Sequence, residues 1–144
     1  MLYQNYLKKL KICPFCHLIG DEIIKQNNSA MLVLARAPYT NTHLLVVPKK
    51  HYSKLISMSI KEKEDIEKLI YYGMEKLHKK YKNVTILYRE GNKKEVGKSI
   101  NHLHYHLIPD LKIGSHDVHW KERKIFSEEE YIKKIKELKK ALFS

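Results

Sequence analysis

The chain has few cysteines, no long apolar run and a shortage of acidic residues. Its two cysteines stand three positions apart, which excludes the framework of several disulfides that small secreted domains use. No apolar stretch approaches the ~20 residues that a membrane-spanning helix needs. The first ten residues hold no uninterrupted signal-peptide core. We therefore expect a cytoplasmic protein in a reducing compartment, with no membrane partner.

The charge balance is strongly basic, with 28 Lys and Arg against 16 Asp and Glu and a net charge of +12. Such an excess favours anionic partners: nucleotides, nucleic acid or acidic surfaces. The alternative is that the lysines, most of which lie in helix-like stretches, form solvated helix faces. Nucleic acid is therefore kept as an alternative partner without being favoured.

The length of 144 residues, without repeats, linkers or low-complexity tracts, predicts one domain with a single modest core. We divide it into an N-terminal helix and cysteine knuckle (1–20), a core (21–110), and a loop with a C-terminal helix (111–144). Strand character is found in the segments 29–35, 43–48, 83–89 and 101–108. Residues 90–98 read as a polar loop.

Helices are expected at 2–10, from Ser59 to about Tyr81, and from Ser127 to the end of the chain. Ser59 and Ser127 are each followed three residues later by Glu, as in a capping box. The apolar positions at helical spacing, which we expect to face the core, are Ile66, Leu69, Ile70, Met74, Leu77, Tyr131, Ile135, Leu138 and Leu142. Strands in runs, with helices between and after them, predict an α+β fold with an antiparallel sheet.

The segment 102–108 is the most informative, because three histidines alternate in it with apolar residues. A strand sends successive side chains to opposite faces, so His102, His104 and His106 are expected to share one face at intervals of ~6–7 Å. Such a row suits metal binding, phosphate binding or proton transfer. The alternatives are histidines hydrogen-bonded within the core, or a catalytic metal site with three histidine ligands.

The sequence Cys13-Pro14-Phe15-Cys16 has the ligand spacing of a zinc knuckle, which needs two further donors. Two neighbouring thiols can also form a redox pair, attach a c-type haem together with His17, or be inert. The missing βαβ pattern and the missing export signal disfavour the first two of these uses. The candidate donors for zinc are His17, His43, His51, His78, His102, His116 and His119.

Together these residues resemble the histidine triad (HIT) superfamily of nucleotide hydrolases and transferases. Residues 102–108 match its signature, in which each of three histidines is followed by an apolar residue, and the run from His43 to His51 resembles the strand before the family's first long helix. Gly97-Lys98-Ser99 is a looser match, and the cysteine knuckle is similar to that of zinc-containing bacterial and archaeal members. The resemblance covers about residues 13–110. It implies about five strands, one long central helix, a C-terminal helix and a homodimer with a continuous sheet.

The resemblance also implies cleavage at the α-phosphate of a nucleotide through a covalent nucleotidyl-histidine intermediate. His104 would be the nucleophile, and His106 would bind the phosphate oxygens. The implied substrate-binding residues are Ser99, Gly97, His43, Arg89 and Asn92. The implied structural zinc site is Cys13, Cys16, His51 and His102. Dinucleoside polyphosphates, nucleoside phosphoramidates and adenylylated adducts are the candidate substrates.

Several positions depart from the family pattern. Ala35 stands where many members carry an Asp or Asn that binds the ribose hydroxyls, and Asp110 stands where Arg is common. Arg36 and Asn41 are candidates to replace the ribose contact. The departures put the substrate in doubt and keep two alternatives open: a nucleotide-binding scaffold with little turnover, and a protein that processes nucleotides linked to nucleic acid.

Overall fold

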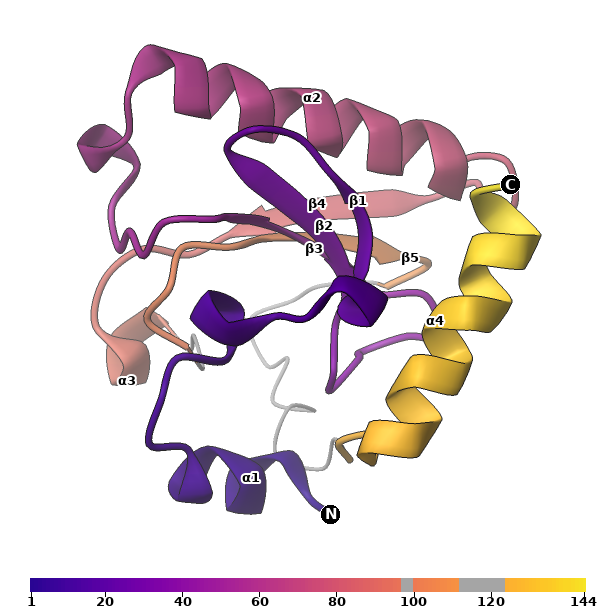
Figure 1. Ribbon diagram of the computed structural model, residues 1–144, viewed down its shortest axis with the longest axis horizontal. Coiled ribbons are helices and arrows are strands. Elements are labelled where there is room, and N and C mark those ends of the chain that lie inside the picture. Colours follow the sequence, from indigo (N-terminus) through magenta and orange to yellow (C-terminus); the bar gives the residue numbers. More distant parts are fainter. Residues whose placement is uncertain (97–99, 112–123) are drawn as a thin grey trace.

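A five-stranded antiparallel sheet forms the centre of the computed structural model, which describes residues 1–96, 100–111 and 124–144 (Figure 1). The strand order is β1-β2-β3-β5-β4. The strands are β1 (Ile23–Gln26), β2 (Ala30–Leu34), β3 (Leu44–Pro48), β4 (Val84–Tyr88) and β5 (Tyr105–Pro109). The predicted α+β fold is confirmed. Sequence patterns miss β1, because its four residues show no alternation of apolar and polar side chains.

The helices are α1 (Tyr3–Lys9), α2 (Ile60–Leu77), α3 (Lys93–Val96) and α4 (Glu128–Leu142). Both predicted capping boxes are present: the Ser59 hydroxyl accepts from the Glu62 N–H at 3.1 Å, and the Ser127 hydroxyl accepts from the Glu130 N–H at 3.2 Å. Helix α2 ends at Leu77, short of Tyr81, because the chain turns there. The short α3 lies within the predicted loop 90–98.

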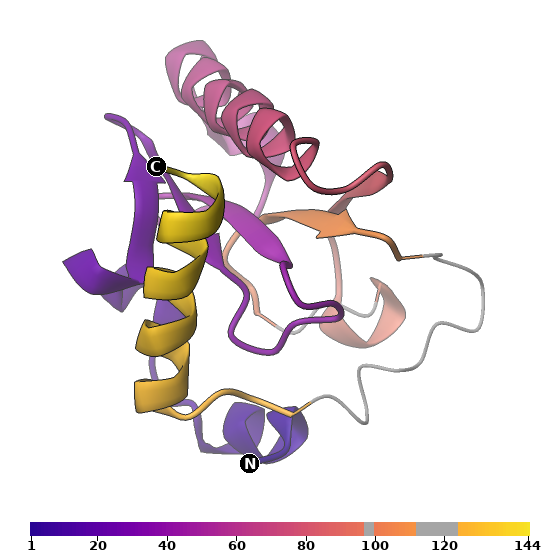
Figure 2. The same ribbon diagram turned by 90° about the vertical axis from the view of Figure 1, so that its right-hand side faces the viewer.

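The two faces of the sheet carry different partners. Helix α2 packs on one face, where alternate residues of β2, β3 and β5 form the main core, including Leu32, Val46 and Leu107, and apolar residues of α4 join this core at one end of the sheet. On the other face a smaller cluster joins Val33 and Leu45 to Phe15. Figures 1 and 2 show α1 on the opposite side of the sheet from α2. This second face, left without a long helix over it, is the one that carries the site described below.

The histidine segment differs from its prediction as a strand over 101–108. Strand β5 begins only at Tyr105 and includes Pro109, so His102 and His104 lie in the segment that leads into the strand. There the Leu103 N–H donates to the Tyr52 carbonyl at 2.7 Å instead of to a neighbouring strand. The alternation nevertheless holds, since Leu103 and Leu107 both belong to the main core.

Among the described residues, no helix combines the length and the apolar character needed to cross a bilayer.

Helix α2 lies close against the sheet at Gly73. A Cβ at this position would lie 2.6 Å from Cδ1 of Leu107 and 3.5 Å from Cδ1 of Leu32, both in the main core. We predict that Gly73→Ala lowers the free energy of unfolding by about 1 kcal/mol, because overpacking outweighs the gain in helix propensity. Urea denaturation measures the change. Gly20→Ala is the control, since a Cβ at Gly20 meets nothing within 4 Å; a Gly73→Ala variant as stable as the parent would contradict the prediction.

Candidate active site and metal centre

A cavity of about 250 Å³ opens on the sheet face opposite α2. Its wall includes His43, His104 and His106, together with Leu45 and Phe15 of the smaller cluster. His104 and His106 therefore border a hollow, and the alternative of histidines satisfied within a closed core does not describe these two, whereas His102 is buried and is not in this wall. The predicted row is brought together as expected for His104 and His106, whose ring centroids are 4.8 Å apart.

The protonation of His104 follows from its hydrogen bond. Its Nδ1 lies 2.7 Å from the carbonyl oxygen of His102. A carbonyl only accepts, so Nδ1 of His104 is the protonated nitrogen and donates. In the neutral ring, Nε2 then carries the lone pair. Neutral imidazole with an unprotonated Nε2 is the form that can act as a nucleophile.

A second chain of hydrogen bonds sets the protons of His43 and His106. The backbone N–H of Tyr39 donates to Nδ1 of His43 at 3.1 Å, so the proton of neutral His43 is on Nε2. Nε2 of His43 lies 2.8 Å from Nδ1 of His106 and donates to it. The proton of neutral His106 is consequently on its own Nε2. The two neighbouring imidazoles thus have complementary states: His104 has its lone pair on Nε2, and His106 has a donor there.

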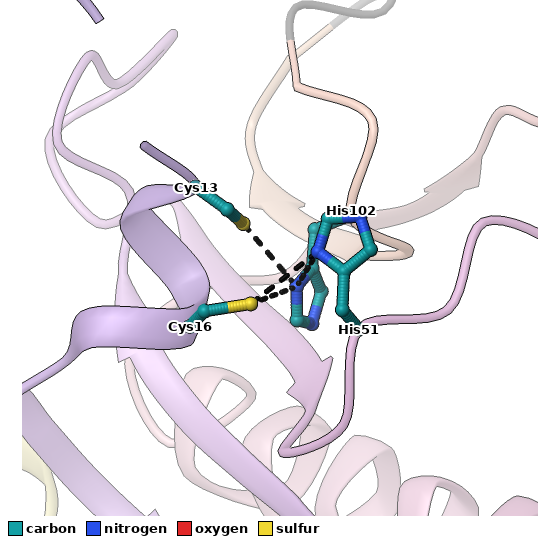
Figure 3. A group of neighbouring side chains, drawn as sticks. All are labelled: Cys13, Cys16, His51 and His102. Atoms are coloured by element: carbon teal, nitrogen blue, oxygen red, sulfur yellow. Dashed lines mark hydrogen bonds between the residues drawn. The ribbon is translucent and has the colours of Figure 1, made fainter. Parts of the chain in front are cut away.

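The cysteine knuckle and two histidines form a compact cluster (Figure 3). The ligand atoms of Cys13, Cys16, His51 and His102 all lie within 4.8 Å of one another. Nδ1 of His102 is 3.4 Å from Sγ of Cys13, 3.5 Å from Sγ of Cys16 and 3.2 Å from Nδ1 of His51. Tetrahedral coordination by two thiolates and two imidazoles places such atoms about 3.3 to 3.8 Å apart. These four residues could hold a metal ion.

The ring of His102 is in the tautomer that can bind a metal ion in the cluster. Its Nε2 lies 2.8 Å from the carbonyl oxygen of Pro48 and donates to it, which leaves the lone pair on Nδ1, inside the cluster. Burial, with smaller contributions from the neighbouring His51 and His104, lowers the pKa of His102 to about 4 against the opposing effect of the Pro48 bond. The ring is therefore neutral at pH 7. The alternative of a catalytic metal held by three histidines of the row fails, because His102 faces the cysteines while His106 bonds to His43.

Without a cation, the thiol of Cys16 favours its protonated form. Burial and the neighbouring Cys13 thiol raise the pKa of Cys16. A bound cation reverses this preference for the protonated form, so metal binding releases protons and weakens as the pH falls.

Of the remaining predicted site residues, some line the cavity and others do not. Arg89 lines the cavity, whereas Asn92 is not among the described residues of its wall and accepts from the Val96 N–H within the turn of α3. Asp110 follows β5 with φ +53°, a conformation that Asp tolerates better than most residues. Gly97, Lys98 and Ser99 lie outside the described residues, as do His116 and His119.

Sequence reasoning missed two contributors to the site. The ring of Phe15 lies 5.4 Å from that of His104 and 5.6 Å from that of His102, between the metal cluster and the nucleophile candidate. Tyr39 stacks on His43 at 5.3 Å in addition to its backbone bond. Phe15 could have been found from the sequence, because it is an apolar residue between the two cysteines of the knuckle. Tyr39 lies in a turn and offers no such signal.

The metal cluster leads to a direct prediction. Cys16→Ser should lower metal affinity by more than about a hundredfold, because losing a ligand costs more than losing a hydrogen bond that supports one. It should also lower the melting temperature. Elemental analysis and thermal unfolding of protein purified without added metal measure both effects. His17→Ala is the control, since His17 adjoins Cys16 but is outside the cluster. Full metal content in Cys16→Ser would exclude this site.

Comparisons with known proteins agree with this geometry. An uncharacterized HIT-like protein of Methanocaldococcus jannaschii is 30% identical over 130 residues, which cover 87% of this chain and 99% of that protein. An adenosine 5'-monophosphoramidase of Schizosaccharomyces pombe is 26% identical over 67% of this chain and 73% of its own. The solved structure of Plasmodium falciparum diadenosine triphosphate hydrolase has a TM-score of 0.69 at 20% identity, covering 88% of this chain and 79% of that one. The HIT domain model matches residues 18–113. The chain therefore belongs to the HIT domain family.

Proposed function

We propose that the protein is a nucleotide hydrolase or nucleotidyl transferase that cleaves at the α-phosphate, with His104 as the nucleophile. The observation that carries the proposal is the hydrogen bond from Nδ1 of His104 to the His102 carbonyl. It assigns the lone pair to Nε2 of a residue in the wall of the cavity. An imidazole in this state is an uncharged nucleophile at neutral pH and later a good leaving group.

The reaction divides into two displacements. In the first, the Nε2 lone pair of His104 forms a bond to the α-phosphorus while the bond from phosphorus to the leaving group breaks, and the leaving group departs with the electron pair. In the second, water attacks the same phosphorus and gives up a proton to solvent, the P–N bond breaks with its electron pair returning to Nε2 of His104, and the nucleoside monophosphate leaves. A transferase would use another acceptor in place of water.

His106 supports both displacements by holding a proton toward the phosphate. Its Nε2–H can donate to the phosphate oxygens, on which negative charge grows in the transition state. The bond from His43 fixes that proton on Nε2, and the Tyr39 N–H fixes the tautomer of His43 in turn. His43 is thus a positioning residue in this mechanism. Arg89, also in the cavity wall, adds a positive charge for a polyphosphate.

The substrate class is taken from the chemistry and from the relatives. A dinucleoside polyphosphate, a nucleoside phosphoramidate and an adenylylated adduct all present an α-phosphorus bearing a leaving group. The names of the S. pombe phosphoramidase and the P. falciparum diadenosine triphosphate hydrolase support the first two classes. We propose Ser99 and Gly97 as further phosphate contacts and Asn92 as a loop contact, as the family resemblance implies.

We propose zinc as the metal of the cluster, in a structural role. Two thiols and two imidazoles at these separations fit a four-coordinate zinc site with no open position. Cys13, Cys16, His51 and His102 would hold the ion, which would join the N-terminal knuckle to the histidine segment. No step of the reaction passes through it.

A nucleotide-binding scaffold with little turnover is the second candidate. Ala35 favours it, because this buried residue of the cavity wall cannot hydrogen-bond a ribose hydroxyl through its side chain.

The two candidates predict different covalent chemistry. Incubation of the wild type with nucleoside phosphoramidates and dinucleoside polyphosphates should yield nucleoside monophosphate and, after acid-free quenching, a nucleotidyl adduct on His104. His104→Asn should lose the adduct and at least about 1,000-fold in turnover, since no other nucleophile replaces it. Intact and peptide mass spectrometry detect the adduct. A wild type that binds nucleotides but never forms the nucleotidyl adduct would support the scaffold function instead.

We further propose that the chain is one domain that acts in the cytoplasm as a homodimer with a continuous sheet. Strand β4 is an edge of the sheet, and Ile86 on it is 48% exposed. Ile86→Lys should shift the protein to monomer in sedimentation velocity. Ile19→Lys is the control, because Ile19 is similarly exposed (59%) but precedes β1 at the other edge. A wild type that is monomeric at micromolar concentration would refute the dimer.

A further inference from the structure

The two cysteines of the knuckle are joined by a single 3₁₀ turn, Pro14–His17, for which Cys13 is the N-cap. The backbone N–H of Cys16 donates to the Cys13 carbonyl at 3.3 Å, so the turn closes between these two residues. Side chains three residues apart in such a turn lie one above the other, and the turn rises about 6 Å over that interval. This rise lies within the range of about 4.4–6.8 Å between the Cα atoms of a disulfide.

The sulfur atoms of the pair are already neighbours. They lie within 4.8 Å of each other. Rotation about the two Cα–Cβ bonds is the movement that brings them to the bonding distance of about 2 Å. The chain has no other cysteine, so a disulfide within one chain can only join Cys13 to Cys16.

The two thiols differ in their access to solvent. Cys16 is exposed, whereas Cys13 is half-buried. An accessible cysteine beside a second cysteine that can react with its sulfenic acid is typical of sites that are oxidised reversibly. Thiolate is the form that oxidants attack, and a thiol that coordinates a metal is already deprotonated. Cys16 is therefore placed to meet an oxidant, and Cys13 to complete the disulfide.

Metal binding and disulfide formation compete for the same two sulfurs, because the thiolate is the form that binds metal. Once both sulfurs are in a disulfide, only His51 and His102 remain as donors, two fewer than a structural zinc site uses. Oxidation would therefore break the connection between the knuckle and His102 that Figure 3 shows.

A change in the knuckle also reaches the cavity. Phe15 lies in the 3₁₀ turn between the two cysteines, and its ring is 5.4 Å from that of His104 and 5.6 Å from that of His102. Phe15 and His104 both line the cavity wall. The oxidation state of the sulfurs is thus linked to the surroundings of His104 through one aromatic side chain.

We propose that Cys13 and Cys16 form a reversible oxidation site, at which a hydroperoxide converts the metal-binding thiolates into a disulfide within the chain and releases the metal. This inference rests on the proposed zinc site and not on the proposed reaction at His104. With hydrogen peroxide, the Cys16 sulfur attacks one oxygen, the O–O bond breaks, and hydroxide leaves with the bonding electrons. The Cys13 sulfur then attacks the Cys16 sulfur, the S–O bond breaks, and a second hydroxide leaves. Together the two sulfurs lose two electrons, which reduce the peroxide.

Hydrogen peroxide added to the zinc-loaded wild type tests the proposal. Intact mass spectrometry should detect chains that have lost two hydrogens, and a colour-forming chelator should detect one released zinc ion for each of them. Dithiothreitol followed by zinc should restore both the mass and the metal content. Three results would each overturn the proposal: oxygen added to Cys16 without a disulfide, disulfides only between chains, or disulfide-containing chains that keep their zinc.

Cys13→His is the matched control, because it keeps four donors around the metal and leaves one thiol. Under the same treatment it should form no disulfide within the chain and should keep its zinc longer than the wild type. Equally fast loss of zinc from this variant would overturn the proposal, since a single thiol would then suffice. The mass and zinc measurements on the wild type decide the question even if the variant fails to fold.

The link to the cavity has its own readout. In NMR spectra of ¹⁵N-histidine-labelled protein, the ring signals of His104 should shift on oxidation and return after reduction with zinc. Unchanged signals would overturn the link through Phe15. A purified protein that holds no zinc and takes none up refutes the zinc site and this inference with it. A missing nucleotidyl adduct refutes only the covalent mechanism and leaves the oxidation site in place.

Discussion

His102 is the residue on which the rest of the site depends, because each of its three polar groups contacts a different part of the site. Its Nδ1 enters the Cys13, Cys16 and His51 cluster, its Nε2–H is bonded to the Pro48 carbonyl, and its own carbonyl accepts from Nδ1 of His104. Each of these bonds fixes a proton or an orientation that the others need. A change at any one of them leaves a buried polar group without its partner, at a cost of about 1–3 kcal/mol.

This arrangement couples the metal cluster to the proposed nucleophile without involving the metal in the reaction. The carbonyl of His102 belongs to a residue anchored by the cluster, and the ring of Phe15, from the loop between the two cysteines, lies against both His102 and His104. The main core on the other face of the sheet fixes the same segment through Leu103 and Leu107. His104, the proposed nucleophile, therefore owes its tautomer and its position to contacts on both sides of the sheet.

Much of the fold could be predicted from the sequence, because short-range sequence patterns define several of its elements. The capping boxes at Ser59 and Ser127 and the helical spacing of apolar residues define α2 and α4. The short β1 and the late start of β5 could not, since strand limits depend on which neighbours offer hydrogen bonds. Leu103, for example, donates to Tyr52 of a distant loop instead of to a strand.

For the site, residue types and spacing identified the histidine row and the cysteine pair, and the family resemblance selected His51 and His102 as the partners of the cysteines. The structure brings Cys13, Cys16, His51 and His102 together. The proton positions could not be derived in this way, because they depend on backbone groups such as the Pro48 carbonyl and the Tyr39 N–H. The surroundings of Arg36, itself a candidate from the sequence, could not be derived either. Arg36, Tyr6 and Glu128 are far apart in the sequence and meet only through α1 and α4.

The tautomer of His104 is the central claim and can be measured directly. Nitrogen-15 NMR of the imidazole rings at neutral pH, with ¹⁵N-labelled histidine and assignment by His104→Asn, distinguishes protonated from unprotonated ring nitrogens. We predict that Nδ1 of His104 is protonated and Nε2 is not, while His43, His102 and His106 show the opposite pattern. A proton on Nε2 of His104, with Nδ1 unprotonated, would contradict the claim.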